Sequence, residues 1–587
     1  MLSPPFILLD DARPGGAAAR LYRDPVETFV AHDVDAVAAA LEVVRSAPAR
    51  GLHAAGYLAY EAAATFEPAL ALPSSGTGPL LWFGLFERFE TIADVPAWLP
   101  DPAGAWNSPP RPLIDRADYD ARLAQVIALI NAGDLYQANL TFPAEVRIEG
   151  DPLALYARLR AASAAGYGAV IATGDETLLS LSPELFFALE GRQLTVRPMK
   201  GTARRDADPA PDRAAAAALA ADPKQRAENL MIVDLMRNDL SRVAVAGSVA
   251  VPSLFAVESY PTVHQMVSTV TAELAPARGG IDVLAALFPC GSITGAPKIR
   301  AIEALAAIEA QPRGVYTGAI GRIDANGDAM FNVAIRTLRI ARGDAKAVIG
   351  LGGGIVADST SAAEWDEAHA KGAFLTTGLR GFDLIETMAF DPVVGIALLE
   401  RHLARMKASA ASFGFAFDRH AARNELQAAT FRLAQPSRVR LVLSPSGAFA
   451  IETAPAPPMP DAPVPVAIVP LPVPASDFRL RHKTSDRDFY DAARRAADAF
   501  EVAFTDAEGF LTEGSFTSLF VERGATLLTP PLARGLLPGV LRASLIDSGR
   551  AVEADLTPAD LAGGFFIGNG LRGLVPAVVA PPQRACL

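Results

Sequence analysis

Two successive stretches that alternate strand-like and helix-like segments, joined by KGAFLTTGLRGF at 371–382, constrain the fold of this chain most strongly. The join has no serine-rich or proline-rich tether. Each stretch mixes short apolar runs with amphipathic runs, which predicts a mixed α and β (α+β) fold on both sides of the join. The 587 residues correspond to about three to four domain-sized units.

The first stretch divides at a proline-rich segment, Pro96 to Pro112, into an amino-terminal part, 1–115, and a core, 116–376. From Asp118 apolar residues recur at helical spacing until Asn131-Ala132-Gly133, which predicts a helix and its end. Further strands are expected at 168–173, 185–189, 314–323, 329–340 and 347–356, and further helices near 213–220, 224–238, 281–288 and 297–310.

The second stretch, 377–587, divides at the proline cluster APAPPMPDAPVPV at 454–466. A small lobe, 382–465, and a large lobe, 466–587, are expected on its two sides. The sequence therefore predicts two domains, 1–376 and 377–587, each with two parts.

Charge and cysteine content exclude several classes of protein. The chain has 53 Lys and Arg against 65 Asp and Glu, a net charge of −12, so we expect no nucleic-acid partner and no anionic membrane partner. Its two cysteines, Cys290 and Cys586, cannot form a disulfide framework or a four-thiolate zinc site. The amino terminus has no basic region ahead of its short apolar run, and no run of about 18 apolar residues follows. We expect a cytoplasmic protein.

Five segments of the first stretch combine glycine, a charged residue and an element end in ways that packing does not require: RPMKGT (197–202), ENLMIVDLMRNDL (228–240), GSITGAPK (291–298), AIRT (334–337) and GGGIV (352–356). Each alone has an ordinary explanation, such as a turn or a solvated lysine. Glu228 on one helix could meet Glu364 and Glu367 on another around a hard cation such as Mg²⁺. Two solvated acidic helix faces are the alternative that these residues leave open.

In chain order, these segments and GYLAYEA (56–62), GDLYQANLT (133–141), LSPELF (181–186) and TVHQMVSTV (262–270) resemble the chorismate-utilising enzymes. Within that family the chain is most similar to component I of aminodeoxychorismate synthase. The resemblance implies a two-layer β-sandwich with surrounding helices, and chorismate as substrate.

The resemblance also implies roles for individual residues. It implies that carboxylates hold Mg²⁺ against the ring carboxylate of chorismate. It also implies that an arginine and a tyrosine bind the enolpyruvyl carboxylate, that glycines let their backbone N–H groups approach the substrate, and that other side chains line the ring. The metal ligands would be Glu228, Glu364 and Glu367. The substrate-binding groups would be Arg336, Tyr316, Gly352, Gly353, Gly354 and Thr294, and His264 would be a catalytic residue that lines the ring site. Glu184 would act as general acid and base for the departing ring hydroxyl.

Lys200 distinguishes the subfamilies. By the resemblance, a lysine here adds covalently to the ring and ammonia then displaces it, whereas anthranilate synthase-like relatives typically carry alanine. Lys200 therefore favours the para-amino product. Cys290 stands where relatives commonly have glycine, and we interpret it as a small buried thiol. Because the chain offers no glutaminase nucleophile, a separate glutamine amidotransferase subunit is implied.

The second stretch resembles the fold type IV pyridoxal phosphate enzymes, which have two lobes. The motifs are FDLIETM (382–388), RHLARM (401–406), RHKTSDRDFYDAARRAA (481–497), GFLTEGSFTSLFVERG (509–524), LLTPPLARGLLPGVLR (527–542) and GNGLRGLVP (568–576). By resemblance, Lys483 binds the cofactor covalently, Glu513 pairs with the pyridine nitrogen, and Arg405 with the backbone of Val540 and Leu541 binds the phosphate. Asn569 and Arg572 resemble the substrate loop of the lyase, whereas Ser518 replaces a common asparagine.

Together the resemblances imply a bifunctional enzyme of folate-precursor synthesis: an aminodeoxychorismate synthase followed by a carbon–oxygen lyase that releases pyruvate and 4-aminobenzoate. The lyase assignment rests on the fusion, since the first product would be the second substrate. The alternative is an anthranilate or salicylate-type synthase fused to a branched-chain or D-amino-acid aminotransferase. The resemblance also implies a possible homodimer.

Overall fold

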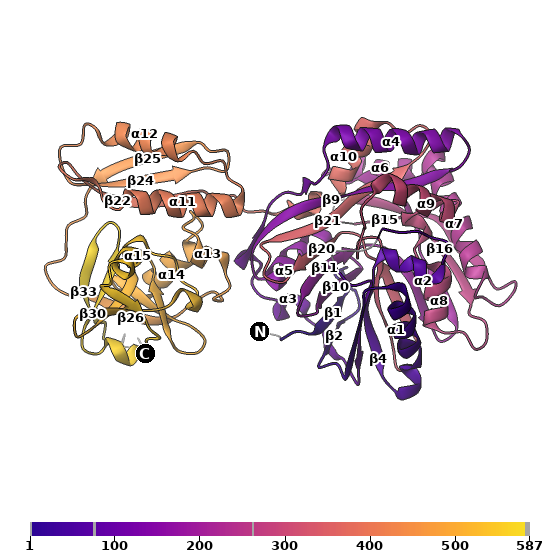
Figure 1. Ribbon diagram of the computed structural model, residues 1–587, viewed down its shortest axis with the longest axis horizontal. Helices are drawn as coiled ribbons and strands as arrows, with labels where there is room; N and C mark the ends of the chain where they lie inside the picture. The colour runs from indigo at the N-terminus through magenta and orange to yellow at the C-terminus, as the bar shows by residue number, and fades with distance from the viewer. Residues whose placement is uncertain (1–2, 74–77, 261–262, 582–587) are drawn as a thin grey trace. The chain divides into compact units, whose positions relative to one another are not determined.

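A computed structural model describes residues 3–73, 78–260 and 263–581 (Figure 1). The chain forms two compact units. Unit 1 comprises Met1–Pro100, Pro109–Val146 and Tyr156–Gly378, and unit 2 comprises Asp101–Ser108, Arg147–Leu155 and Leu379–Leu587. The predicted boundary at 376/377 and the smaller parts within each half stay predictions. Cys586 lies outside the described residues.

Unit 1 is built on two large sheets. Among the described residues, the first sheet has eleven strands in the order β17-β9-β21-β20-β11-β10-β1-β2-β6, with β7 and β8 also paired to β9. Their bounds are β1 Phe6–Asp10, β2 Ala19–Arg23, β6 Glu90–Ile92, β7 Ala105–Asn107, β8 Arg111–Pro112, β9 Gln137–Gly150, β10 Tyr167–Ala172, β11 Glu176–Ser182, β17 Gly295–Ala296, β20 Thr337–Ala341 and β21 Lys346–Ile355.

The second sheet has ten strands among the described residues, in the order β14-β16-β13-β12-β19-β18-β4-β5-β3, with β15 paired to β16. Their bounds are β3 Glu27–Ala31, β4 His53–Leu58, β5 Leu81–Phe86, β12 Leu185–Glu190, β13 Gln193–Val196, β14 Met199–Arg204, β15 Ala250–Ser259, β16 Val263–Glu273, β18 Ala319–Ile323 and β19 Ala329–Val333.

The two sheets bury apolar side chains against each other. One core cluster joins Ile7 and Ile171 of the first sheet to Tyr57 and Trp82 of the second. This sandwich, with helices around it, confirms the predicted fold class of the first half. The helices are α1 Val34–Ser46, α2 Ala63–Phe66, α3 Val95–Trp98, α4 Arg116–Asn131, α5 Pro152–Ser163, α6 Pro209–Ala221, α7 Pro223–Ser241, α8 Gly280–Leu287, α9 Lys298–Glu309 and α10 Ser361–Lys371.

Local sequence explains where α4 begins. The Asp115 side chain accepts a hydrogen bond from the Asp118 backbone N–H at 2.8 Å, so Asp115 caps a helix that starts two residues before the predicted position. Tyr119, Leu123 and Val126 are buried, as their helical spacing predicts.

The single strand expected at 329–340 is wrong. The structure has β19 and β20 with a break between them, and Arg336 within the break has φ of +50°. A continuous apolar run gives no signal for such a break, because the left-handed region is a local backbone state rather than a pattern of hydrophobicity. The break lets β19 and β20 belong to different sheets.

Unit 2 contains two further sheets. A four-stranded sheet has the order β23-β22-β24-β25, and an eight-stranded sheet has the order β28-β27-β26-β33-β32-β29-β30-β31 among the described residues. The strand bounds are β22 Leu384–Asp391, β23 Gly395–Ile396, β24 Ser437–Leu443, β25 Phe449–Pro455, β26 Val464–Pro470, β27 Glu501–Thr505, β28 Leu511–Gly514, β29 Ser518–Arg523, β30 Thr526–Thr529, β31 Ala551–Glu553, β32 Phe565–Asn569 and β33 Gly573–Val579. The helices are α11 Leu399–Phe413, α12 Arg419–Thr430, α13 Phe478–Arg481, α14 Asp488–Ala497 and α15 Val540–Asp547.

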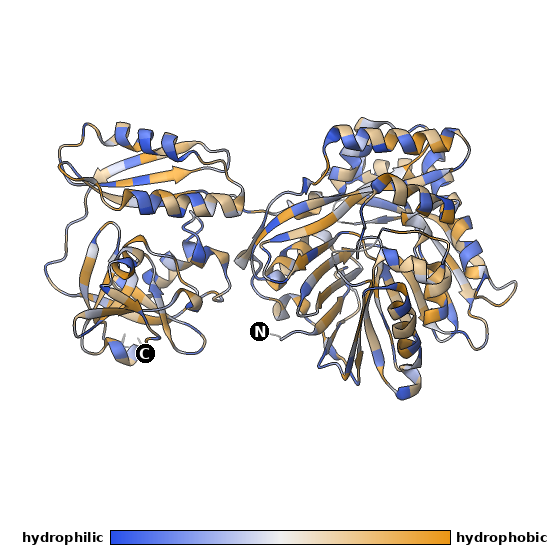
Figure 2. Cartoon of the chain, in the orientation of Figure 1, coloured by the Kyte–Doolittle hydropathy of each residue, from blue (hydrophilic) through white to orange (hydrophobic). Residues whose placement is uncertain are grey.

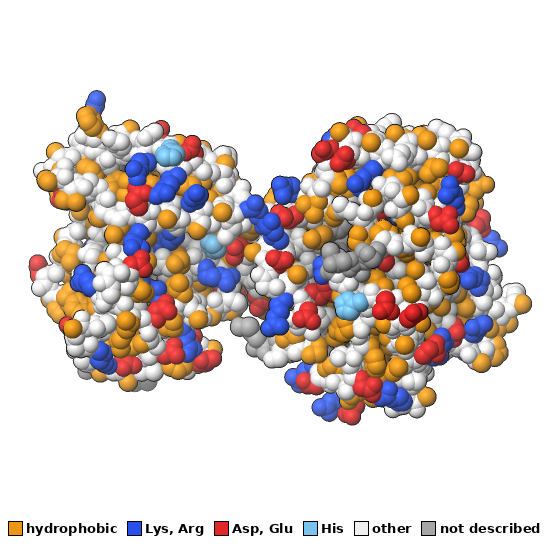
Figure 3. Space-filling view, in the orientation of Figure 1, with side chains coloured by type: hydrophobic (Ala, Val, Ile, Leu, Met, Phe, Trp, Pro, Cys, Tyr) orange, Lys and Arg blue, Asp and Glu red, His pale blue; other side chains and the backbone are white. Residues whose placement is uncertain are grey.

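The distribution of hydrophilic and hydrophobic residues agrees with the amphipathic patterns in the sequence. Many helices alternate hydrophilic and hydrophobic residues along their length (Figure 2), as elements with one face on a sheet do. Charged side chains of both signs occur on the visible face of each unit (Figure 3). In the described part of the chain, no helix is both long enough and apolar enough to cross a membrane.

Candidate functional site

Lys200 is a half-buried amine with no hydrogen-bond partner among the described residues. It lies on β14, and its Nζ forms no hydrogen bond or ion pair with the described residues. Nζ lies 3.3 Å from the position that a Cβ on Gly354 of β21 would take. Burial is the main cause that lowers the pKa of Lys200, and the Lys371 ammonium lowers it further, while nearby glutamates oppose both. A lowered pKa favours the neutral amine, which is the nucleophilic form.

Glu184 is a buried carboxyl close enough to Lys200 to interact electrostatically with it. It lies between β11 and β12 and accepts a hydrogen bond from Ser292 Oγ at 2.6 Å. Burial raises the pKa of Glu184 to about 7, although the Ser292 hydrogen bond and the Lys200 charge act in the opposite direction. A carboxyl with such a pKa is available as a proton donor near neutral pH.

The glycines of β21 allow close approach by their neighbours. A Cβ on Gly352 would lie 2.3 Å from the carbonyl oxygen of Leu140, and a Cβ on Gly354 would lie 2.6 Å from Gln137 Nε2. Because the obstacle at position 352 is backbone, glycine is required there, whereas a side chain at position 354 would force the end of the Gln137 side chain to move. Gly353, between them, would direct a Cβ toward Glu364 Oε2 at 3.3 Å. These glycines therefore lie where Lys200 and the acidic helix α10 meet the first sheet.

Of the three glutamates predicted as metal ligands, Glu228 and Glu364 are half-buried and Glu367 is exposed. Ser359 Oγ donates to Glu364 at 2.6 Å, and Lys371 Nζ lies 2.8 Å from Glu367. Burial raises the pKa of Glu228 and of Glu364, so the uncompensated negative charge is costly.

Carboxylates are ligands that Mg²⁺ prefers, but these do not form a ready site. Within 3–73, 78–260 and 263–581, no group of three His, Cys, Asp or Glu side chains is close enough to hold a metal ion. The Lys371 ammonium, which also donates to Gly352 O at 2.9 Å, is the cation beside Glu367. The magnesium assignment stays a prediction.

Arg336 is a half-buried cation. Its guanidinium forms no ion pair or hydrogen bond with the described residues, and burial lowers the pKa of Arg336. The residue holds φ of +50°, and its carbonyl accepts a hydrogen bond from Leu181 N at 3.1 Å. Strained backbone and an unpaired half-buried charge are typical of ligand-binding positions, and a guanidinium suits a carboxylate.

Tyr316 lies in a different cavity. This cavity, of about 320 Å³, is lined mainly by apolar side chains and also by Tyr316, Arg122 and Thr337. Neither Arg336 nor Lys200 lines it. The structure therefore does not place Tyr316 and Arg336 around one carboxylate, and their shared role stays a prediction.

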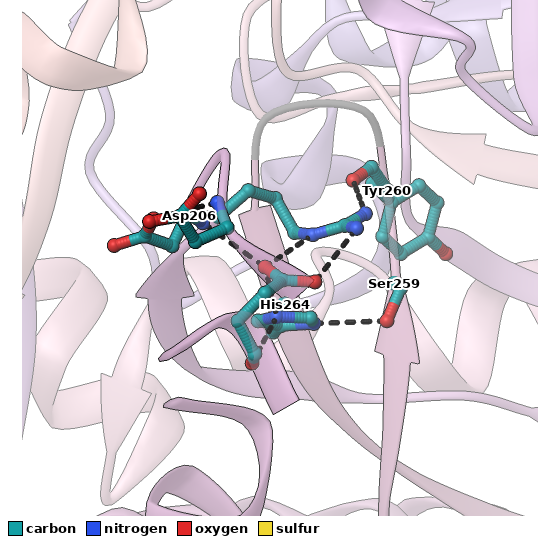
Figure 4. Close-up of polar contacts among 7 residues, drawn as sticks. Asp206, Ser259, Tyr260 and His264 are labelled. Atoms are coloured by element: carbon teal, nitrogen blue, oxygen red, sulfur yellow. Dashed lines mark hydrogen bonds and ion pairs between the residues drawn. The ribbon is translucent and has the colours of Figure 1, made fainter. Parts of the chain in front are cut away.

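His264 is held from both sides by protein groups (Figure 4). Its Nε2 lies 2.9 Å from Asp212 Oδ1, and its Nδ1 lies 2.8 Å from Ser259 Oγ. Arg205 donates two hydrogen bonds of 2.8 Å to the Asp212 carboxylate. Because both ring nitrogens are occupied, the structure does not bring His264 to a ligand together with Lys200.

Thr294 and Cys290 belong to one buried turn. Thr294 Oγ1 donates to Cys290 O at 3.3 Å and to Gly291 O at 3.2 Å. Burial is the main cause that raises the pKa of Cys290 to about 12, and the Glu184 carboxylate adds to it. The thiol is therefore unreactive, which agrees with its interpretation as a small buried side chain.

Arg313 connects two segments that carry predicted site residues, and sequence reasoning missed it. Its guanidinium donates to Glu309 Oε1 at 2.7 Å, to Asn139 O at 2.8 Å and to Ile293 O, next to Thr294, at 3.2 Å. Its backbone N–H donates to Glu61 at 2.6 Å. Glu61 lies within the predicted motif GYLAYEA. Its partner Arg313 is 252 residues away, and no spacing in the sequence indicates this contact.

Lys483 is the corresponding half-buried amine of unit 2. Its Nζ forms no hydrogen bond or ion pair with the described residues, and its carbonyl accepts from Ile385 N of β22 at 2.9 Å. Burial lowers the pKa of Lys483 to about 7, with a further contribution from Arg405 and an opposing one from Glu386. Lys483 is thus available for covalent chemistry with an aldehyde.

Glu513 is a buried carboxyl at the end of β28. It accepts hydrogen bonds from Tyr490 Oη and, at 3.1 Å, from Leu537 N. Burial raises the pKa of Glu513 to about 7, because these two donors do not cancel the loss of water. Glu501 fixes the turn that follows, since it accepts from Ser515 Oγ at 2.6 Å.

The predicted phosphate-binding groups lie together. Arg405 on α11 donates to Pro538 O at 3.1 Å, directly before α15. The first turn of α15, Val540 and Leu541, has free backbone N–H groups because its N-cap, Gly539, offers no side chain. A Cβ on Gly539 would lie 2.6 Å from Ser518 Oγ. A helix N-terminus and a guanidinium fit a phosphate, so these residues suit pyridoxal phosphate.

Asn569 and Arg572 shape the loop after β32. Asn569 Oδ1 accepts from the backbone N–H of Leu571 at 3.0 Å and of Arg572 at 2.9 Å. The Arg572 guanidinium donates to Pro458 O at 3.3 Å. Asn569 therefore stabilises the turn, and the role of both residues in substrate binding stays a prediction.

Comparison with known proteins matches both halves. Residues 4–377 match the chorismate binding enzyme family, and residues 383–579 match the amino-transferase class IV family. The chain is 45% identical over 267 residues to aminodeoxychorismate synthase component 1 of Salmonella typhimurium, covering 46% of this chain and 58% of the relative. It is 36% identical over 291 residues to anthranilate synthase component 1 of Haloferax volcanii, covering 49% and 56%. The matched part thus spans less than two thirds of these relatives.

A solved structure supports the fold of the first half. The crystal structure of anthranilate synthase component I from Streptococcus pneumoniae TIGR4 superposes with a TM-score of 0.53 and 25% identity. The superposition covers 64% of this chain and 93% of that structure.

Proposed function

Because this chain belongs to the chorismate binding enzymes, and carries a class IV amino-transferase domain after that region, we propose that it is a bifunctional enzyme of 4-aminobenzoate synthesis. The first half aminates chorismate to 4-amino-4-deoxychorismate. The second half removes pyruvate from that product and forms 4-aminobenzoate. The observation that carries the proposal is the half-buried amine of Lys200, which has no hydrogen-bond partner among the described residues, since anthranilate synthase-like relatives typically carry alanine at this position.

In the first reaction Lys200 and Glu184 share the chemistry. The neutral Lys200 Nζ forms a bond to the ring while the ring hydroxyl leaves, and Glu184 gives that hydroxyl its proton so that water departs. Ammonia then forms its own bond to the ring and the bond to Nζ breaks. Glu184 takes back a proton from the incoming nitrogen, which restores both side chains.

Arg336 supplies the charge that an anionic substrate needs. An unpaired half-buried guanidinium gains a partner when a carboxylate binds, so binding relieves its desolvation. We place one carboxylate of chorismate on Arg336. No step is assigned to Mg²⁺, since the described carboxylates do not enclose a metal.

Ammonia comes from a separate glutamine amidotransferase subunit. Such a subunit hydrolyses glutamine with a reactive cysteine. In the described part of this chain the one free cysteine is Cys290, which is buried. Its raised pKa keeps it protonated at neutral pH.

In the second reaction the residues of unit 2 hold and use pyridoxal phosphate. When bound, this group withdraws electrons from the carbon that bears the substrate amino group. Glu513 would hold the pyridine nitrogen, Arg405 and the first turn of α15 would hold the phosphate, and Lys483 would bind the aldehyde. The Lys483 amine would take the proton from the carbon that bears the amino group. The bond from the neighbouring ring carbon to the enolpyruvyl oxygen would then break, and the departing enolpyruvate would take up a proton to become pyruvate as the ring becomes aromatic.

Product analysis tests the proposal. The purified chain is incubated with chorismate, Mg²⁺, ammonium at alkaline pH and pyridoxal phosphate, and the products are separated chromatographically. We expect 4-aminobenzoate and pyruvate, and accumulation of aminodeoxychorismate in Lys483→Ala. Formation of anthranilate or salicylate would refute the interpretation that Lys200 directs the para-amino product. If added aminodeoxychorismate is not converted, the lyase assignment is refuted.

A further inference from the structure

His402 has a buried ring nitrogen without a partner. The side chain, on α11, is 1% exposed, and its Nε2 has no hydrogen-bond partner among the described residues. Its Nδ1 lies 2.6 Å from Glu386 Oε2. An orphaned buried polar atom is uncommon and calls for an explanation, such as a missing ligand.

Glu386 fixes which nitrogen of His402 carries the proton. This buried β22 carboxylate accepts two hydrogen bonds from Arg405, at 2.8 and 2.6 Å, besides the contact with His402. Arg405 and His402 are the reason that the pKa of Glu386 is lowered to about 2 despite its burial. A carboxylate only accepts, so Nδ1 of His402 carries the hydrogen and Nε2 of the neutral ring presents a lone pair.

The orphaned Nε2 lies beside the loop after β32, and both α11 and β32 pack against α15. It lies 2.8 Å from the position that a Cβ on Gly570 would take. Gly570 follows β32, and a Cβ on Gly568 of that strand would lie 2.8 Å from Leu541 in the first turn of α15. Arg405, one turn along α11 from His402, reaches Pro538 just before the same helix.

The charged groups around His402 suit the binding of an anion next to it. The charged or titratable groups that act on it are Glu386 from β22, Arg405 from α11 and Lys483 from the segment after α13. Burial is the largest cause that lowers the pKa of His402, and Arg405 and Lys483 add to it while Glu386 opposes it. A dianionic phosphate near Nε2 adds a second opposing charge and so favours the protonated ring.

We propose that His402 is a phosphate-binding residue of the cofactor site, at which Nε2 takes up one proton from water when the phosphate binds and then donates a hydrogen bond to a phosphate oxygen. Glu386 acts as a positioning residue, since it holds both His402 and Arg405. The proposal rests on the assignment of pyridoxal phosphate to unit 2.

Isothermal titration calorimetry measures how many protons are taken up on binding. Pyridoxine 5′-phosphate has no aldehyde and cannot react with Lys483, and inorganic phosphate lacks the pyridine ring that Glu513 would contact. Each probe is titrated at pH 8 into the full chain in two buffers that differ in ionisation enthalpy. At this pH the phosphate is already a dianion, because its second pKa is about 6. We expect uptake of close to one proton for both probes.

Variants separate His402 from the other titrating groups. His402→Gln keeps Lys483 and Glu513, so the proton uptake should vanish and the affinity for either probe should fall about tenfold or more. Glu386→Gln should weaken binding in the same direction. His420→Gln, which changes an exposed histidine on α12, should behave as the unchanged chain does.

Three results would overturn the proposal. Proton uptake that is equal in His402→Gln and the unchanged chain would assign the proton elsewhere. Binding without proton uptake would leave His402 neutral, although the pyridoxal phosphate assignment would stand. If neither probe binds and pyridoxal phosphate does not bind either, both the role of His402 and the pyridoxal phosphate assignment would be overturned. If His402→Gln does not fold, ¹⁵N NMR of histidine-labelled wild-type chain decides, since Nε2 must change from a lone pair to an N–H when phosphate is added.

Discussion

Replacing Glu184 by glutamine should make unit 1 more stable at neutral and alkaline pH while removing activity. Burial raises the pKa of Glu184 from 4.5 to about 7. Between these two values the unfolded chain has lost the proton and the folded chain has kept it, so the stability contributed by Glu184 falls as pH rises through this window. The difference of about 2.5 pKa units, at 1.36 kcal/mol each, corresponds to about 3 kcal/mol.

Glutamine has nearly the same shape, cannot ionise, and keeps an oxygen for the Ser292 hydroxyl. The free energy of unfolding of Glu184→Gln, minus that of the unchanged chain, should therefore rise by about 3 kcal/mol between pH 4.5 and pH 8. Chorismate amination should fall by about 10²- to 10⁴-fold, because the proton donor is gone.

The assay is urea unfolding at a series of pH values, with the transition of unit 1 followed by tryptophan fluorescence. Only the difference between the two chains is interpreted, since other groups titrate equally in both. Glu190→Gln, at the exposed end of β12, is the matched control and should show no such rise. A stability difference that stays constant from pH 4.5 to pH 8 would refute the argument that Glu184 is protonated in the folded chain.

Four further outcomes are expected. Lys200→Ala should abolish chorismate consumption and spare pyruvate release from added aminodeoxychorismate; equal loss of both activities would contradict the separation of the two sites. Lys483→Ala should lose the visible absorbance of bound pyridoxal phosphate, whereas the exposed Lys407→Ala should keep it; an unchanged spectrum would defeat the assignment. Arg336→Lys should raise KM for chorismate by about tenfold or more with a smaller effect on kcat, since one bidentate contact is lost, and an unchanged KM would place the carboxylate elsewhere. Removal of divalent cations with EDTA should stop amination and leave the second reaction intact, and amination that survives would refute the predicted role of Glu228, Glu364 and Glu367.

Most of the fold was predictable because its signals are local. The helix α4 and the strand β21 beside Lys200 follow from apolar periodicity and from turn residues, which need only a short window of sequence. The strand β14, which carries Lys200, was not predicted. The break at Arg336 was not predictable, since one residue in the left-handed region leaves the hydrophobic pattern unchanged.

The residues of the candidate sites also divide into those that short motifs predict and those that depend on contacts between distant segments. Lys200, Glu184 and Lys483 stand in short motifs and were found from them. Glu386 and His402 also stand in motifs, yet their pairing joins a strand to a helix and leaves no trace in spacing. Arg313 was missed for the same reason, because its partners Glu61 and Asn139 lie far away along the chain.

The absence of any protein partner at the Lys200 amine has a consequence for how such a chain can diverge. No hydrogen bond or ion pair to the described residues would be broken if this side chain were shortened, so the framework around it does not depend on the lysine. The backbone contacts that fix the neighbouring turns are made by other residues, such as Arg313. A substitution at position 200, the predicted reacting group, would therefore need no compensating change in the described framework around it.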